Sequence, residues 1–498
     1  MIAVSIARGR HRMVIAEHKH LVEQGAQLVE LRVDYIVRSV DLKRLLTNRP
    51  CPVIVACRRP QDGGKWARSE DERRMLLRSA IADGVDYIDL EEDIAGTIPR
   101  FGKTKRIVSY HNFQETPANL REIYDRCASH DPDIVKIATM AHDPKDNLRV
   151  LQLIADSEIP TVAICMGDIG TASRILAGKF GAPFTYATFH QERELAPGQL
   201  SFDQMRSIYR YDDINPDTDV YGLIGDPIGT PLAPLMHNAS FHAMKLDKVF
   251  VPFRVPREHL EPFLGYCRQF GLRGLIVNTP HKESIVPFLS ATDREVDHIG
   301  AANTVVIDGF DRSGYNTEFK AALESIDATL GRGGEIDVLS GKTAIVLGAG
   351  GMAKAVAFAL RSRDVHVAIA SRTLERSQEL AHKLNCRAVE WSSRHSQNAE
   401  IVVNCTPVGM HPHVDDSPFE GDYLRRSMIV FDTVYNPEQT LLIKRAREKQ
   451  CYVVTGVDMF VRQSALQFER FAGQAASQEV MRQSLRKWIG AAKTSMAE

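Results

Sequence analysis

The sequence of 498 residues has little of what marks a secreted, membrane or nucleic-acid-binding protein. Its 8 cysteines are isolated, and no two have the CxxC spacing typical of zinc or redox sites. No apolar run approaches the ~18 residues that a membrane span needs, and the start, MIAVSIARGR, has no basic stretch ahead of an apolar one. The formal net charge of −1 favours neither nucleic acid nor an anionic membrane as a partner. We therefore expect a cytoplasmic protein without disulfides or bound metal.

The composition is that of an ordinary globular protein. Apolar residues make up 44% of the chain and charged residues 25%, both close to the average. At ~150 residues per domain, a chain of this length predicts about two to four domains. Small molecules are the expected partners, and the sequence leaves the oligomeric state open.

The N-terminal part alternates short apolar segments with segments long enough for one helix each. The apolar segments read IAVSIA at 2, LVELRV at 28, PVIVAC at 52, DYIDLE at 86, RIVSYH at 106, DIVKIA at 133, TVAICM at 161 and PFTYAT at 183. Strands that alternate with helices form parallel sheets through right-handed crossovers. The pattern predicts an α/β fold with a closed (β/α)8 barrel, and an open doubly wound sheet is the alternative.

Polar side chains gather where these predicted strands end. Barrel enzymes build their active sites at the C-terminal ends of the strands. Each of these side chains alone reads as a solvated rim residue, but together their cations, carboxylates and histidine suit a small substrate that bears a carboxylate. The candidates are Glu30, Arg32, Arg58, Asp89, Glu91, His111, Lys136, Arg174 and Gln199.

Lys136 is unusual among them because it lies inside an apolar strand, DIVKIATM. Burying an ammonium group is costly. Burial next to other cations lowers the pKa of a lysine, and the free amine that results can attack a carbonyl. Lys136 is therefore a candidate nucleophile.

Six segments of this part resemble type I 3-dehydroquinate dehydratases, in order and spacing, from the first strand to about Ser207. They are ELRVD (30–34), YIDLE (87–91), SYHNFQETP (109–117), VKIATM (135–140), GDIGTASRILAGKFG (167–181) and APGQ (196–199). The resemblance implies a barrel in which Lys136 forms a Schiff base with the substrate ketone. It also implies that His111, with an ordinary imidazole pKa near neutrality, moves the protons, and we expect Glu91 to orient it.

The resemblance assigns the remaining candidates to substrate binding. Arg174 is expected to hold the substrate carboxylate, for which a planar guanidinium is suited. Glu30, Arg32, Arg58 and Gln199 are expected to hold the ring hydroxyls. One departure is Leu195, which stands before APGQ where family members often have serine.

A polar segment, YRYDDINPDTDV at 209–220, separates this part from the rest. It carries four aspartates and lacks helical periodicity, which is typical of a linker. A new folding unit is therefore expected to start near 219.

The second half contains a glycine-rich turn between two apolar strands, in TAIVLGAGGMAKAVAFALRSRDVHVAIASRTLER at 343–376. A strand, a glycine turn, a helix and a second strand form the setting that dinucleotide binding requires. The turn brings a pyrophosphate to a helix N-terminus, and its predicted cofactor residues are Gly348, Ala349, Gly350, Gly351, Met352 and Ala353.

The end of the second strand indicates which dinucleotide binds. NAD sites usually place an acidic residue there for the ribose hydroxyl. This sequence has Ser371, Arg372, Thr373 and Arg376 instead. Two cations and two hydroxyl groups suit a 2′-phosphate, so the predicted cofactor is NADP.

The second half resembles shikimate dehydrogenases over nearly its whole length. The segments are GDPIG with PLMHN (225–238), RGL with TPHKESI (273–285), HIGAANTV (298–305), GYNTE (314–318), NCTPVGM (404–410), FDTVYNP (431–437) and GVDMFVRQSALQFE (456–469). The resemblance implies a two-domain unit with a Rossmann-like NADP domain. The expected domains are the barrel at 1–210, a linker at 211–219, a substrate domain at 220–320 completed by helices at 456–498, and the NADP domain at 321–455.

The resemblance implies roles for individual residues, and at some positions this sequence departs from the pattern of the family. Lys282 is expected at the reacting hydroxyl, with Glu318 as its partner where the family has aspartate. Expected substrate contacts are Asn303, Asn278, Tyr435 and Gln463, and further cofactor contacts are Thr406 and Gly456. The family's paired serines for the carboxylate are Pro231 and Ala233 here, its threonine is Asn278, and an asparagine is Ile276.

These departures leave three hypotheses open. The first is a bifunctional enzyme of the shikimate pathway, which dehydrates 3-dehydroquinate and reduces the product with NADPH. The second keeps the dehydratase but gives the dehydrogenase another hydroxylated acid, such as quinate, or weak activity. The third is an NADP-binding sensor fused to the dehydratase.

Overall fold

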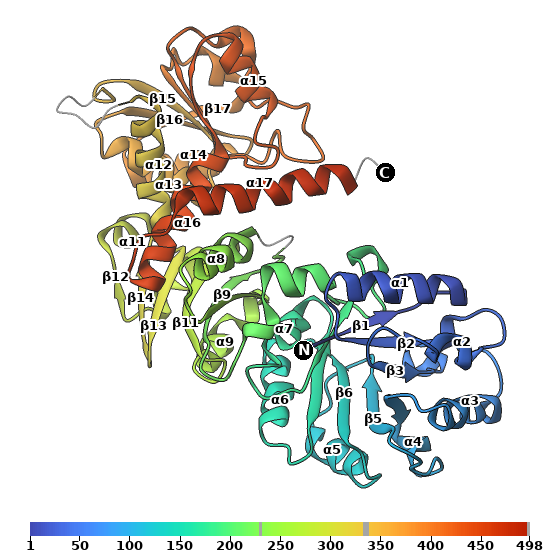
Figure 1. Cartoon of the computed structure of the whole chain (residues 1–498). Helices are drawn as coiled ribbons and strands as arrows, with labels where there is room; N and C mark the ends of the chain where they lie inside the picture. The colour runs from blue at the N-terminus through green and yellow to red at the C-terminus, as the bar shows by residue number, and fades with distance from the viewer. Residues whose placement is uncertain (229–231, 332–337, 496–498) are drawn as a thin grey trace. The chain divides into compact units, whose positions relative to one another are not determined.

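The computed structural model describes residues 1–228, 232–331 and 338–495. The chain divides into two compact units, one of Met1–Pro234 with Lys245–Leu272 and the other of Leu235–Met244 with Arg273–Glu498. Figure 1 shows the elements of both. The domain boundaries expected from the sequence, including the linker at 211–219, stay predictions.

The first unit contains eight parallel strands. They are β1 (Ile2–Ile6), β2 (Leu28–Arg32), β3 (Val53–Ala56), β4 (Tyr87–Glu91), β5 (Lys105–Asn112), β6 (Ile134–Met140), β7 (Thr161–Met166) and β8 (Thr185–Thr188). Their order is β7-β6-β5-β4-β3-β2-β1-β8, so β1 pairs with both β2 and β8. A doubly wound sheet reverses its strand order, whereas this order runs on without reversal. The predicted barrel is therefore confirmed. It is nearly closed, because no ladder joins β7 to β8 among the strands described.

Helices follow these strands around the barrel. They are α1 (His11–Glu23), α2 (Leu42–Leu46), α3 (Glu70–Ala82), α4 (Glu92–Ala95), α5 (Leu120–Ala128), α6 (Pro144–Ala155) and α7 (Thr171–Leu176). The start of α3 has a capping box, in which Ser69 accepts from the backbone of Glu72 and the Glu72 side chain accepts from the backbone of Ser69. This reciprocal bonding fixes where the helix begins.

The interior of the barrel explains where the polar site lies. One apolar layer is formed by Ala3, Leu28, Ile54, Ile107, Ile134, Val162, Phe184 and Tyr186, with Tyr87 packed against it. Alternate residues of a strand point to the same face. The residues two positions further along five of these strands are Ser5, Glu30, Asp89, Ser109 and Lys136, and all are buried. The next layer towards the C-terminal ends of the strands is therefore polar.

The rest of the first unit contains the parallel pair β9 (Asp219–Gly225) and β10 (Lys248–Arg254), with α9 (Leu260–Tyr266). Helix α8 (Leu232–Ala243) begins in the first unit and ends in the second.

The second unit begins with a mixed ladder. Strand β13 (Thr304–Asp308) pairs antiparallel with both β11 (Leu272–Val277) and β14 (Asp311–Tyr315), and β12 (Ala291–Thr292) pairs parallel with β14. Short helices α10 (His281–Ser284) and α11 (Arg294–Ile299) lie between them in sequence, and α12 (Thr317–Thr329) follows.

The second unit also holds a six-stranded parallel sheet of Rossmann-like order, β17-β16-β15-β18-β19-β20. Its strands are β15 (Thr343–Leu347), β16 (His366–Ser371), β17 (Arg387–Glu390), β18 (Ile401–Asn404), β19 (Ile429–Asp432) and β20 (Tyr452–Val454). Its helices are α13 (Gly351–Arg361), α14 (Leu374–Leu384) and α15 (Leu441–Glu448), followed by α16 (Gly456–Ala472) and α17 (Gln478–Ser495). The order reverses between β15 and β18, and open α/β sheets bind their ligands at such a switch point.

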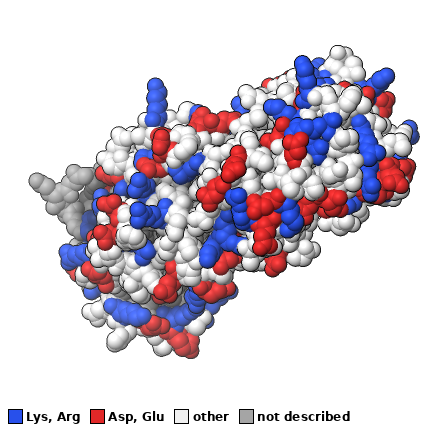
Figure 2. All heavy atoms as spheres, turned by 90° about the horizontal axis from the view of Figure 1, so that it is seen from below, with Lys and Arg blue, Asp and Glu red and all other residues white. Residues whose placement is uncertain are grey.

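Surface charge is mixed on the face that Figure 2 shows, where basic and acidic side chains are interspersed among the residues described. Within the described ranges, no helix is both long and apolar enough to cross a membrane.

Candidate active sites

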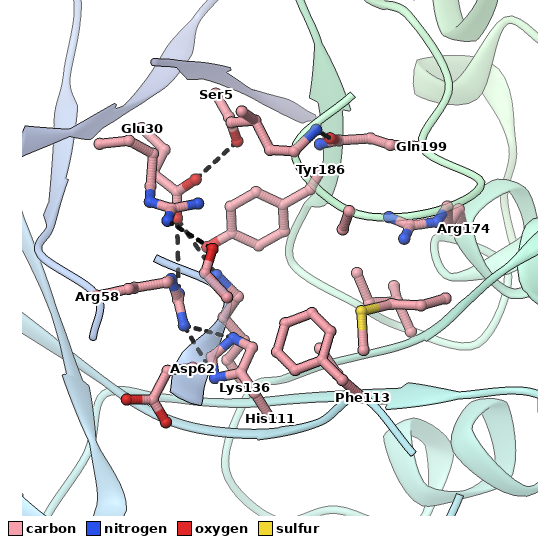
Figure 3. A pocket seen from close by; sticks show the side chains of 17 residues that line it. Ser5, Glu30, Arg58, Asp62, His111, Phe113, Lys136, Arg174, Tyr186 and Gln199 are labelled. Atoms are coloured by element: carbon pink, nitrogen blue, oxygen red, sulfur yellow. Dashed lines mark hydrogen bonds and ion pairs between the residues drawn. The ribbon is translucent and has the colours of Figure 1, made fainter. Parts of the chain in front are cut away.

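A pocket opens at the C-terminal ends of the barrel strands (Figure 3). It gathers most of the sequence-predicted barrel residues. The lining side chains come from Ser5, Glu30, Arg32, Arg58, Asp62, Gly63, His111, Phe113, Lys136, Ala138, Ile164, Met166, Arg174, Tyr186, Leu195, Ala196 and Gln199.

Lys136 lies at the centre of the polar layer and is 5% exposed. Its Nζ donates to Asp89 Oδ2 at 3.1 Å and to Glu30 Oε1 at 3.3 Å. Burial and the nearby guanidinium of Arg58 lower the pKa of Lys136, although Asp89 and Glu30 oppose the shift. The structure therefore has the predicted surroundings, which increase the fraction of Lys136 present as free amine.

Arg58 and Asp89 complete the charge balance around this lysine. Arg58 Nη2 donates to Asp89 Oδ2 at 2.6 Å, and Ser109 Oγ donates to Asp89 Oδ1 at 2.6 Å. Burial opposes ionisation of Asp89, but Arg58 and Lys136 outweigh it and hold the pKa of that carboxyl below its usual value. Two cations and two carboxylates, Glu30 included, thus form one buried network, in which each charge is paired.

His111, at the end of β5, contacts Arg58, whose Nη1 lies 2.9 Å from His111 Nδ1. Burial and the cations of Arg58 and Lys136 lower the pKa of His111 well below its usual value. The expectation of a pKa near neutrality is therefore wrong in this structure. A neutral imidazole is the form that can accept a proton.

The structure corrects the expected pairing of Glu91 with His111. Glu91 Oε2 accepts from Arg73 Nη1 at 2.7 Å, and Glu91 is not among the residues that line the pocket. The physical reason is that Arg73, in α3, is fully buried and requires carboxylate partners, which it finds in Glu91 and Glu70. The pocket-lining carboxylate that the sequence interpretation missed near His111 is Asp62, which also accepts from Arg59 at 2.6 Å.

Arg174 faces the same pocket with an incomplete set of partners. It is 1% exposed, its Nη2 donates to the Pro197 carbonyl at 3.3 Å, and its Nε has no partner within the described part of the chain. Burial lowers the pKa of Arg174 to about 10. A buried guanidinium with a free donor suits a carboxylate ligand.

The other predicted barrel residues have protein partners. Arg32 forms a double hydrogen bond with Asp34, at 2.9 and 3.0 Å. Gln199 Oε1 accepts from the backbone N–H of Leu195 at 3.1 Å, so these two residues shape the segment beside the pocket. Both Arg32 and Gln199 still line the pocket.

Several lining residues escaped the sequence interpretation. Ser5 donates to Glu30 at 2.7 Å, Phe113 stacks on His111 with ring centroids 6.5 Å apart, and Tyr186 lies against Lys136. The two-residue periodicity of the strands could have indicated Ser5 as a member of the lysine layer. Nothing in PFTYAT distinguished Tyr186 from an ordinary strand tyrosine.

In the second unit, Lys282 and Glu318 form the expected pair. Lys282 Nζ donates to Glu318 Oε1, and Glu318 is 1% exposed at the first turn of α12. A Cβ added at Gly351 would lie 3.7 Å from Lys282 Cδ, so the lysine and the glycine turn lie side by side. Nearby, Asn303 is buried, donates to Thr317 Oγ1 at 3.1 Å and accepts from the Thr317 backbone at 3.0 Å.

The remaining predicted substrate residues of the second half differ in exposure. Asn278 is exposed, and Gln463 is 8% exposed on α16. Tyr435 stacks on Phe460 with ring centroids 4.9 Å apart. Ala233 is buried in α8, while Pro231 lies outside the described residues.

The glycine turn fits a dinucleotide. Gly348 has a φ of 115°, and a Cβ there would lie 2.9 Å from the Cys405 carbonyl, so glycine is required. A Cβ at Gly350 would meet nothing within 4 Å, which leaves room for a pyrophosphate over the start of α13. The turn runs on through Ala349 to Gly351, Met352 and the buried Ala353 of α13.

The other predicted cofactor residues lie at or just after the ends of strands β16, β18 and β20. Arg372, Thr373 and Arg376 are exposed beyond β16, and Ser371 Oγ accepts from Ser377 at 2.8 Å. Across the switch point, Thr406 N–H donates to Asn404 Oδ1 at 2.9 Å. Gly456 is required by packing, because a Cβ there would lie 2.2 Å from the Val434 carbonyl.

Comparison with known protein families accounts for both parts of the chain. The family profile described as type I 3-dehydroquinase matches residues 2–216. Three further profiles match the shikimate dehydrogenase substrate binding domain at 223–305, shikimate/quinate 5-dehydrogenase at 334–433 and the shikimate 5′-dehydrogenase C-terminal domain at 456–486.

Among solved structures, a shikimate dehydrogenase in complex with NADP+ matches with a TM-score of 0.51 at 33% identity, over 55% of this chain and 97% of that one. The quinate dehydrogenase from Corynebacterium glutamicum in complex with NAD has a TM-score of 0.50 at 28% identity, over 54% and 99%. The shikimate dehydrogenase (NADP(+)) of Methanocaldococcus jannaschii is 35% identical over 55% of this chain and 98% of its own. The bifunctional 3-dehydroquinate dehydratase/shikimate dehydrogenase of Arabidopsis thaliana is 35% identical over 500 residues, which cover 96% of this chain and 82% of that protein. The chain belongs to the family of bifunctional 3-dehydroquinate dehydratase/shikimate dehydrogenases.

Proposed function

We propose that the barrel dehydrates 3-dehydroquinate through a Schiff base on Lys136, and that the second half reduces the resulting 3-dehydroshikimate to shikimate with NADPH. The buried network around Lys136 is the observation that carries the first assignment. Fusion of the two sites suits consecutive steps, because the product of one is the substrate of the other.

The dehydratase chemistry begins with the amine of Lys136. The lowered pKa of this group increases the fraction present as free amine, which attacks the substrate ketone and loses water to form an iminium. The iminium withdraws electrons and acidifies the neighbouring C–H. Glu30 and Asp89, both within 3.3 Å of Nζ, stabilise the cationic nitrogen throughout.

His111 then transfers the proton. As a neutral imidazole it removes the proton from the carbon next to the iminium. Because its pKa is well below the usual value, the imidazolium that forms readily donates its proton to the departing hydroxyl, which leaves as water. A water molecule then hydrolyses the iminium of the product and frees Lys136. Arg58, which contacts the ring, disfavours a lasting positive charge on His111.

Substrate binding in the barrel relies on the guanidinium of Arg174. Its Nε is buried and has no partner among the residues that the structure describes, and a substrate carboxylate supplies an acceptor of opposite charge. Glu30, Arg32, Arg58 and Gln199 line the same pocket, and we assign them to the ring hydroxyls.

In the second half, Lys282 and Glu318 act on the oxygen that NADPH reduction leaves with a negative charge. NADPH, when bound at the glycine turn, supplies the hydride. Lys282 donates a proton to that oxygen, and Glu318 keeps the lysine positioned. We assign Asn303, Tyr435 and Gln463 to the ring hydroxyls and Arg372 and Arg376 to the 2′-phosphate.

Ala233 favours a second candidate for this half. Ala233 has no hydroxyl where the family has a serine, so the part of the site expected to hold the carboxylate differs from that of the family. A related hydroxylated acid such as quinate is therefore the alternative substrate. The profile match to shikimate/quinate 5-dehydrogenase is compatible with either acid.

We also propose that the protein is cytoplasmic. All 8 cysteines are free thiols, as expected in the reducing cytoplasm, although the Arabidopsis relative is named chloroplastic.

Separate steady-state assays of the two reactions test the function. Lys136→Ala should abolish dehydration of 3-dehydroquinate and leave NADPH-dependent reduction of 3-dehydroshikimate intact. Lys282→Ala should do the reverse. The assignment of either half is wrong if its variant keeps wild-type turnover in the reaction assigned to it.

A further inference from the structure

Tyr186 lies in the barrel pocket, and none of the roles above uses it. It belongs to β8 and is 3% exposed. Figure 3 shows its ring in the middle of the lining side chains, between Glu30 and Arg174. It is therefore placed to contact both Lys136 and a bound substrate.

The face of the ring holds the nitrogen that reacts. Lys136 Nζ lies 3.8 Å from the centroid of the Tyr186 ring. A cation over an aromatic face is attracted by the ring quadrupole, whereas a neutral amine is not. The ring therefore stabilises the cationic forms of this nitrogen, which include the iminium.

The hydroxyl of Tyr186 is buried and has no hydrogen-bond partner among the described residues. Such groups are rare in folded proteins, because leaving a polar atom unpaired costs free energy. Burial and the carboxylates of Glu30 and Asp89 raise the pKa of Tyr186 well above its usual value, so the hydroxyl stays protonated and can donate. The pocket that it lines is where a substrate oxygen would lie.

We propose that Tyr186 is a further substrate-binding residue of the barrel. Its hydroxyl donates a hydrogen bond to an oxygen of the bound cyclic hydroxy acid, while its ring holds the nitrogen of Lys136 close to the carbonyl. The inference rests on the dehydratase function proposed above.

Two substitutions distinguish the contribution of the Tyr186 hydroxyl from that of its ring. Tyr186→Phe removes only the hydroxyl, so it should raise KM for 3-dehydroquinate by about 3- to 10-fold, as expected for one hydrogen bond, and should change kcat little. The melting temperature should not fall, because in the free protein the hydroxyl bonds none of the described residues. Tyr186→Leu removes the ring as well and should in addition slow formation of the adduct that borohydride traps on Lys136.

Tyr211→Phe is the matched control. The Tyr211 hydroxyl is also buried and has no partner in the described part of the chain, but Tyr211 does not line the pocket. Loss of this hydroxyl should therefore leave KM unchanged. Reduction of 3-dehydroshikimate by the same preparations should stay at the wild-type rate, because Lys282, Glu318 and the glycine turn lie in the second unit.

The outcomes are distinguishable. A wild-type KM in Tyr186→Phe overturns the inference, and so does a lowered melting temperature, since the hydroxyl would then have a partner in the protein. If the wild type and Tyr211→Phe also fail to dehydrate 3-dehydroquinate, the proposed function of the barrel is wrong and the role of Tyr186 falls with it.

Discussion

Replacement of Glu318 by glutamine probes the dehydrogenase half most sharply. The carboxylate is 1% exposed and accepts from Lys282 Nζ, and the lysine side chain is 17% exposed. Glutamine keeps the shape and removes the charge. A hydrogen bond between charged groups contributes about 1.5–3 kcal/mol, which corresponds to about a 10- to 150-fold loss in kcat/KM for 3-dehydroshikimate.

The chain offers a control for this substitution on the same helix. Glu324 is paired with Lys320 at 3.8 Å and its side chain is 41% exposed, so Glu324→Gln should leave both activities unchanged, as is usual for surface pairs. NADPH consumption measures the dehydrogenase, and dehydration of 3-dehydroquinate by the same samples should stay at the wild-type rate. A wild-type kcat/KM in Glu318→Gln would refute the assignment of this pair to the reaction.

Three further predictions concern the substrate, the cofactor and pH. Pro231→Ser combined with Ala233→Ser should lower KM for shikimate by restoring hydroxyl donors. If KM does not change in this double variant while another hydroxy acid is oxidised well, the quinate-like alternative is favoured. Glu318→Asp should act mainly on kcat. The wild type should bind NADP more tightly than NAD. Arg372→Ala should weaken NADP binding by about 10-fold, with little effect on NAD binding. Equal dissociation constants of the wild type for the two cofactors would contradict the assignment of Arg372 to the 2′-phosphate. Because the pKa of His111 is lowered well below 6.5, the neutral base persists as pH falls through 6.5. At saturating 3-dehydroquinate, where Lys136 is already held in the Schiff base, dehydratase kcat should therefore decline only in more acidic buffer. A decline in kcat centred at 6.5 would disagree with this environment.

Local sequence patterns were sufficient to predict the features that depend on residues close together in sequence. The alternation of strands and helices predicted the barrel, and an apolar strand around Lys136 predicted a buried lysine, both of which the structure confirms. Likewise, the glycine turn at 348–351 lies between β15 and α13, as the pattern indicated.

Side-chain partners were harder to predict, because they depend on residues far apart in sequence. Glu91 looked like a partner of His111, but Arg73, buried in α3, takes its carboxylate. Asp62 ends a short 3-10 helix, Pro60–Asp62, that follows β3, and only the fold brings it to the pocket that His111 lines. The contact between Tyr186 and Lys136 joins β8 to β6 across the barrel interior, which no periodicity within either strand reveals.

Trapping of the covalent intermediate tests the chemistry of the barrel most directly. Purified protein is incubated with 3-dehydroquinate, reduced with borohydride, digested and analysed by mass spectrometry. We expect the added mass on the peptide that contains Lys136 and on no other lysine, and no adduct in Lys136→Ala. An adduct on a different lysine, or dehydratase turnover retained by Lys136→Ala, would contradict the Schiff-base assignment.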